Sequence, residues 1–154
     1  MPAVGDPAPD FTLTAQDKSS VTLSEMSGGR VILAFYPAAF TGVCAKEMCT
    51  FSDGMSTLES SGCSVLGISV DSPFSNSAFA DANDISFPLL SDIHREVIDA
   101  YDVALADFVI SGYTVAQRSV FVVEADGSIG YAWVADNPGQ EPDYEAVMAH
   151  CASP

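Results

Sequence analysis

FYPAAFTGVCAKEMCTF, residues 35–51, joins the end of a hydrophobic strand to the start of a helix. The continuous apolar run VILAFY at 31–36 has the length of a strand buried on both faces, which is typical of a sheet covered by helices. Pro37 ends this strand, because proline has no N–H group to give to a strand ladder. From about 41 to 60 the apolar residues recur every three to five positions, which predicts an amphipathic helix.

The rest of the chain alternates in the same way between strand and helix patterns. The predicted elements are hairpins at 11–24 and at 119–134 (turning at Asp126-Gly127), a buried strand at 64–70, a short edge strand at 87–90 containing Pro88, and helices near 75–83, 94–103 and 143–150. This order predicts one α/β domain over 1–154, with a mixed central sheet flanked by helices and an N-terminal hairpin. Ligands of open α/β sheets bind outside the carboxyl ends of the strands, which is where 37–44 is expected.

The charge of the chain argues against two classes of partner. Acidic residues outnumber Lys and Arg by 21 to 5, a formal net charge of −16, which repels nucleic acids and anionic membrane surfaces. No apolar run approaches the roughly 20 residues of a membrane-spanning helix. The N-terminal MPAVGDPAPDF lacks the basic start and apolar run of a secretory signal, so a cytoplasmic protein is expected.

The acidic residues are scattered along the sequence rather than gathered in a tail. This pattern favours a halophile-like surface adapted to a salt-rich cytosol, because about 1 M salt shortens the screening length to roughly 3 Å and makes self-repulsion tolerable. The alternative is an ordinary acidic cytosolic protein.

The position of Cys44 suggests a reactive thiol. A cysteine with the ordinary pKa near 8.5 is mostly protonated at neutral pH, while the thiolate is the nucleophile, so a reactive cysteine needs local positive potential. The first turn of a helix supplies that potential through its unpaired N–H groups and its dipole. Cys44 falls in this turn if Thr41 caps the helix.

PAAFTGVC at 37–44 matches the P-x-x-x-T-x-x-C signature of the peroxiredoxins, thiol peroxidases with a thioredoxin-like fold. Further segments resemble that family in the same order along the chain: VGDPAPDFTL near the start, GISVDSP at 67–73, FPLLSD at 87–92 and QRSVFVV at 117–123. The resemblance weakens after about Ala135. It implies a peroxidase that reduces hydrogen peroxide or alkyl hydroperoxides.

The resemblance also implies roles at the matching positions. Cys44 would be the peroxidatic cysteine that becomes a sulfenic acid. Thr41 would hydrogen-bond the peroxide, Pro37 would close the pocket, and Arg118 would stabilise the thiolate and the peroxide oxygens. An unpaired guanidinium beside a buried strand is costly, so Arg118 should have a partner, either Cys44 or Glu47. An exposed strand-end charge is the alternative interpretation of Arg118.

Cys49 follows Cys44 by five residues, the spacing of the Q-type or bacterioferritin-comigratory subgroup, in which the second cysteine resolves the sulfenic acid. On a helix this spacing puts the two Cα atoms roughly 9 Å apart, beyond the roughly 7 Å that a disulfide tolerates, so the helix must unwind locally. Alternatively Cys49 is a packed helix residue and an external thiol resolves the sulfenic acid, as in the one-cysteine E-type members that the chain also resembles. Cys63, which is expected to be a core or edge residue at a strand start, and Cys151 are the other candidates. We expect Cys151 to lie on a fraying end that could reach Cys44 of another subunit.

Other classes of function fit the sequence less well. A zinc site would recruit the cysteines together with His94 and His150, but only Cys44 and Cys49 approach the spacing of structural zinc ligands, and both histidines are expected at the surface. CAKEMC is not the C-x-x-C of a disulfide oxidoreductase. A non-enzymatic, thiol-dependent binding or chaperone module stays open. With no nucleotide-binding motif and no cofactor expected, electrons should come from a thioredoxin-like protein or a small thiol, and family members commonly form homodimers.

Overall fold

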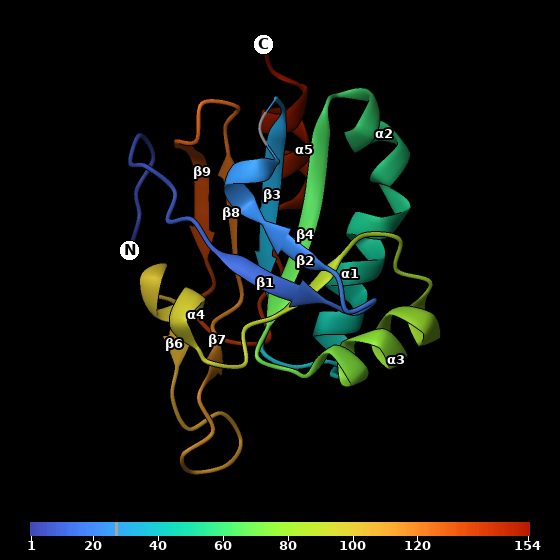
Figure 1. Cartoon of the computed structure of the whole chain (residues 1–154), viewed down its shortest axis with the longest axis vertical. Helices are drawn as coiled ribbons and strands as arrows, with labels where there is room; N and C mark the ends of the chain where they lie inside the picture. The colour runs from blue at the N-terminus through green and yellow to red at the C-terminus, as the bar shows by residue number, and fades with distance from the viewer. Residues whose placement is uncertain (27) are drawn as a thin grey trace.

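A mixed seven-stranded sheet forms the centre of the part of the protein that the computed structural model describes, residues 1–26 and 28–154 (Figure 1). The strand order is β2-β1-β5-β4-β3-β8-β9. The strands are β1 Thr12–Ala15, β2 Ser20–Thr22, β3 Arg30–Phe35, β4 Cys63–Ser69, β5 Leu89–Ser91, β8 Ser119–Val123 and β9 Ile129–Val134. The α/β fold with a mixed sheet and an N-terminal hairpin is as predicted.

Strand β3 is an inner strand of the sheet, as its unbroken apolar sequence predicts. It pairs in parallel with β4 and antiparallel with β8. Its alternate side chains enter two separate cores: Ile32 packs into one, and Leu33 packs into the other. Both side chains are fully buried, so each face of β3 is covered.

Helices cover the two faces unequally. On the Ile32 face lie α1 (Gly42–Asp53), α2 (Met55–Ser60), α3 (Pro73–Asn83) and α5 (Tyr144–Ala152), which contribute Met48, Leu58, Phe79 and Val147 to that core. The Leu33 face is covered by the short α4 (Glu96–Ala100) and the 3-10 helix η1 (Leu23–Glu25). Gly67 of β4 allows the close packing of α1, since a Cβ there would meet Leu89, and would also crowd Met48 of α1.

The helix predicted at 41–60 is two helices. The break falls at Gly54, which ends α1 and precedes α2, and glycine is the residue that most weakens a helix interior short of proline. The helix predicted at 94–103 shrinks to α4, because Arg95 before it has a left-handed φ of 61°. None of the described helices is long and apolar enough to cross a membrane.

The predicted edge strand at 87–90 is wrong in position. The observed β5 is an inner strand, parallel to β4 on one side and antiparallel to β1 on the other. Pro88 lies just before the strand, where its missing N–H costs nothing and its carbonyl accepts from Gly67. The N-terminal hairpin covers the edge that β5 would otherwise expose.

A small second sheet is present that no sequence pattern predicts. Strands β6 (Ala104–Leu105) and β7 (Val115–Ala116) pair antiparallel and carry between them a loop that projects from the body of the protein (Figure 1). Each strand has two residues, too short for a period-two pattern to be recognised.

Candidate active site

Cys44 lies in the first turn of α1, directly after the carboxyl end of β3. Thr41 takes an extended conformation (φ −88°, ψ 147°) and α1 begins at Gly42. The preceding Phe40 has a φ of 65°, a left-handed conformation that is uncommon outside glycine and turns the chain sharply into the helix. Cys44 is fully buried. Its sulfur therefore lies near the unpaired N–H groups of a helix start and away from bulk water.

Arg118 reaches the same sulfur from the other side. It directly precedes β8, and the pairing of Phe35 with Ser119 brings the end of β3 beside it. Its Nη2 donates to Cys44 Sγ at 3.0 Å, and its Nε donates to the carbonyl of Pro138 at 3.1 Å. The residue is only 1% exposed, so the interpretation as an exposed strand-end charge is wrong.

Glu47, one helical turn after Cys44, accepts a hydrogen bond from Nη1 of Arg118 through Oε2 and forms a buried ion pair with it. Burial raises the pKa of Glu47 to about 7, although Arg118 acts in the opposite direction. Burial also tends to lower the pKa of Arg118, but the charges of Glu47 and Cys44 raise it overall. The guanidinium therefore stays charged between a carboxyl group and a thiol.

Two contacts hold the loop between Pro37 and Cys44. The hydroxyl of Thr41 donates to the carbonyl of Ala38 at 3.0 Å, rather than capping α1. The N–H of Ala39 donates to Asp71 Oδ2 at 2.8 Å. Sequence reasoning passed over Asp71, although it lies in the GISVDSP segment quoted above, because nothing in the sequence shows that its carboxylate faces this loop.

Comparisons with known proteins agree with this geometry. The sequence model of the AhpC/TSA family matches residues 4–132. Peroxiredoxin Bcp of Escherichia coli strain K12 is 38% identical over 130 residues, which cover 84% of this chain and 83% of that protein. The chain belongs to the AhpC/TSA family. A Mycobacterium tuberculosis relative is 45% identical over 127 residues, covering 81% of this chain and 80% of the relative.

Solved structures of this family superpose closely on the protein. The crystal structure of peroxidoxin BcpB from Mycobacterium tuberculosis has a TM-score of 0.88 at 29% identity and covers 98% of this chain and 97% of that one. Peroxiredoxin Q of Xanthomonas campestris has a TM-score of 0.84 at 25% identity, with 96% of each chain covered. The resemblance to peroxiredoxins and the thioredoxin-like fold are confirmed. As an AhpC/TSA family member the protein is a thiol-dependent peroxidase, with a peroxide substrate and a thiol reductant.

Cys49 lies on α1 but faces α3 rather than Arg118. Its Sγ is 3.6 Å from the carbonyl oxygen of Asn83 at the end of α3. Burial raises the pKa of the Cys49 thiol, and the nearby Asp53 and Asp84 raise it further. In this family member the second thiol is therefore held protonated and apart from the Arg118 side of the helix.

The remaining cysteines lie elsewhere in the fold. Cys151 belongs to α5 and is only 1% exposed, so the expectation that it lies on a fraying end is wrong. Arg30 donates to the carbonyl of Cys151 itself and to that of Ser153, which holds this end of α5 against the sheet. Cys63 begins β4 and is 2% exposed.

The histidines and acidic residues give no metal centre in the described part of the chain. Within 1–26 and 28–154, no three or more His, Cys, Asp or Glu side chains are grouped to hold a metal ion. His94 is exposed, and His150 pairs with Glu124.

Proposed function

We propose that Cys44 is the peroxidatic cysteine of this thiol-dependent peroxidase. The observation that carries the proposal is the bond of 3.0 Å from Arg118 Nη2 to its sulfur, since charge-assisted hydrogen bonds to a buried atom favour its anionic form. The thiolate attacks one peroxide oxygen, the O–O bond breaks, and the other oxygen leaves as water or an alcohol after taking up a proton. Cys44 becomes a sulfenic acid.

The surrounding residues have proposed roles in the same step. Arg118 stabilises the thiolate and then the charge that develops on the peroxide oxygens, while Glu47 orients the guanidinium. Thr41 hydrogen-bonds the peroxide, and Pro37, which is buried at the end of β3, closes one side of the pocket. Asp71 positions the loop through Ala39. Hydrogen peroxide and alkyl hydroperoxides both fit this chemistry, because only the O–O group enters the reaction.

We propose Cys49 as the resolving cysteine. Two features support this role: it is five residues from Cys44 on the same helix, and its half-buried position requires only the start of α1 to move. Because the two sulfurs face different sides of α1, the first turns must unwind before the disulfide forms. The contact of Cys49 with Asn83 favours the alternative, a one-cysteine peroxidase recycled by a thioredoxin-like protein or a small thiol.

Intact-mass measurement after one equivalent of hydrogen peroxide tests both roles. We expect the wild-type protein to lose two hydrogen masses, with peptide mapping linking Cys44 to Cys49, and to lose helical circular dichroism. The variant Cys49→Ser should instead gain one oxygen mass at Cys44, and a thioredoxin-like dithiol should recycle it at least tenfold more slowly than the wild type. Full recycling of this variant would assign resolution to the external thiol.

We also propose that the acidic surface adapts the protein to a salt-rich cytoplasm. The net charge of −16 comes from carboxylates spread over the surface, among them the exposed Asp53, Glu59, Asp81 and Asp84. The four free cysteines fit a reducing compartment. A homodimer, which the family resemblance implies, would have to form against this self-repulsion, so salt should favour it as well.

Raising KCl from 0.1 to 2 M should increase the melting temperature by several degrees. Salt screens the repulsion between surface carboxylates, which is stronger in the compact folded state than in the unfolded chain. Differential scanning fluorimetry measures the shift, and a sucrose series controls for general solute exclusion. A melting temperature indifferent to KCl would leave an ordinary acidic protein as the better interpretation.

A further inference from the structure

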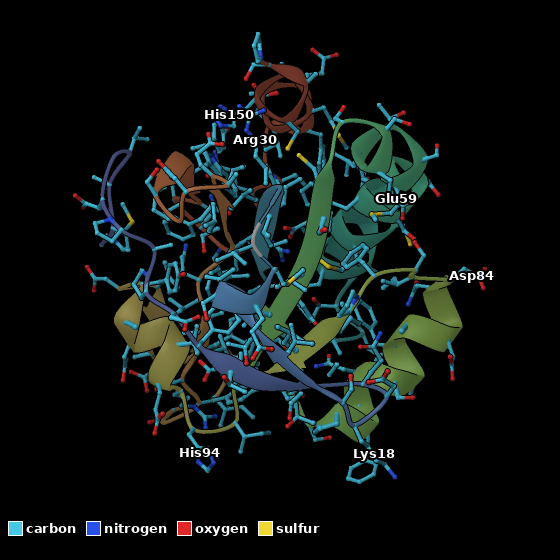
Figure 2. All side chains as sticks on the ribbon, turned by 45° about the horizontal axis from the view of Figure 1, so that its top comes forward. Lys18, Arg30, Glu59, Asp84, His94 and His150 are labelled. Atoms are coloured by element: carbon cyan, nitrogen blue, oxygen red, sulfur yellow. The ribbon has the colours of Figure 1, made fainter. Side chains whose placement is uncertain are left out.

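A polar cluster holds the C-terminal helix α5 to the amino end of β3. Arg30, the first residue of β3, forms an ion pair with Glu124, which follows β8. The other oxygen of Glu124 lies 2.6 Å from Nε2 of His150, in the last turn of α5. Arg30 Nη1 also donates to the carbonyls of Cys151 at 3.2 Å and Ser153 at 2.7 Å. Figure 2 shows Arg30 and His150 close together beside this helix.

Two buried thiols meet beneath this cluster. Cys63, the first residue of β4, pairs in register with Arg30, and Cys151 comes from α5. Cys63 Sγ lies 3.9 Å from the carbonyl oxygen of Cys151. Burial raises the pKa of the Cys151 thiol, and the neighbouring Cys63 side chain raises it further. Cysteines that are 88 positions apart in sequence are therefore in contact in the folded protein.

This pair is separate from the peroxidatic site. Cys63 and Arg30 lie at the amino ends of β4 and β3, whereas Cys44 follows the carboxyl end of β3. A strand rises about 3.3 Å per residue, so the length of β3 alone keeps the two places roughly 16 Å or more apart. In the folded chain, neither Cys63 nor Cys151 can therefore reach a sulfenic acid on Cys44.

We propose that Cys63 and Cys151 form a second redox centre, which peroxide converts into a disulfide joining β4 to α5. The thiolate of one cysteine attacks a peroxide oxygen, the O–O bond breaks, and water leaves after taking up a proton. The sulfenic acid that results is attacked by the second thiol, so the S–S bond forms, the S–O bond breaks, and a second water leaves. The two sulfurs lose two electrons, and the peroxide gains them.

Burial sets the rate of this oxidation. The two thiols are 2% and 1% exposed, so peroxide reaches them only when the last turn of α5 opens. The positive charge of Arg30 lowers the pKa of Cys151, in opposition to burial. The pair should therefore react at least a hundredfold more slowly than Cys44 and respond to sustained peroxide. The disulfide would then fix α5 to β4 and restrict the unfolded chain.

The double variant Cys44→Ser/Cys49→Ser tests the proposal, since Cys63 and Cys151 are the only thiols left in the full-length chain. After prolonged treatment with excess hydrogen peroxide, we expect loss of both alkylatable thiols and a linked peptide containing Cys63 and Cys151. The melting temperature should rise by about 5–10 °C, and dithiothreitol should reverse the rise. Adding Cys63→Ser to the same background should remove both effects.

Two thiols that both remain alkylatable, or that take up oxygen separately without a linked peptide, would refute the second redox centre. If the double variant fails to fold, peptide mapping of the peroxide-treated wild-type protein gives the same two outcomes. The peroxidase rate of Cys151→Ser should stay within twofold of the wild type. A lower peroxidase rate in Cys151→Ser would contradict the separation of the two sites. If Cys44 proved not to be the peroxidatic residue, the peptide linking Cys63 to Cys151 would still be found.

Discussion

Replacing Cys44 with serine should lower the rate of peroxide reduction by roughly 10³-fold or more, because a hydroxyl is not ionised at neutral pH and cannot replace the thiolate as nucleophile. Serine has nearly the volume of cysteine and can accept the hydrogen bond that Arg118 now gives to the sulfur. The fold should therefore survive, and the loss should report on chemistry. Peroxide consumption with dithiothreitol as electron donor measures it.

Cys63→Ser is the matched control for this variant. Cys63 is a buried cysteine in the same core as Cys44, but it lies at the other end of the sheet, away from Arg118. Its replacement carries a similar cost of burying a hydroxyl and should leave the initial peroxidase rate within twofold of the wild type. If Cys44→Ser kept more than a tenth of the activity, the nucleophile would have to be another sulfur.

The parts of the fold that the sequence predicts are those with a long local pattern. The apolar run at 31–36 predicts a central strand, and Pro37 predicts its end. The position of Cys44 in the first turn of a helix follows from both. The inner position of β5 does not follow, because the hairpin that covers it comes from the distant 12–22 segment.

The contacts of the site are harder to predict, because strand register sets them. Arg118 meets Cys44 across 74 positions of sequence only because Phe35 pairs with Ser119. The burial of Cys151 likewise depends on Arg30, which comes from the opposite end of the chain. A charged residue before a buried strand indicates that a partner exists, but the fold determines which one.

Replacing Arg118 with alanine should slow peroxide reduction by at least tenfold, because the guanidinium donates to the attacking sulfur and would stabilise the oxygens of the breaking bond. Stopped-flow consumption of hydrogen peroxide measures this loss. An unchanged rate would remove Arg118 from the mechanism. The same variant should also lose stability, by about 3–5 kcal/mol once the pH is high enough to ionise Glu47, since it leaves that carboxylate buried without its ion pair.

The pH dependence separates the two effects of this substitution. Burial raises the pKa of Glu47 to about 7 in the folded protein. The protonated Glu47 side chain therefore contributes its full stabilisation below the ordinary pKa of 4.5, and this stabilisation is lost as the pH rises through 7. Arg118 lowers this pKa, so in the Arg118→Ala variant the free energy of unfolding should keep falling to a higher pH. The double variant Arg118→Ala/Glu47→Gln removes this titrating group, so urea unfolding from pH 5 to 9 should show a free energy of unfolding that depends less on pH than that of Arg118→Ala. Its peroxidase rate should stay low, because glutamine cannot supply the missing positive charge, and a recovered rate would mean that Arg118 acts on folding alone.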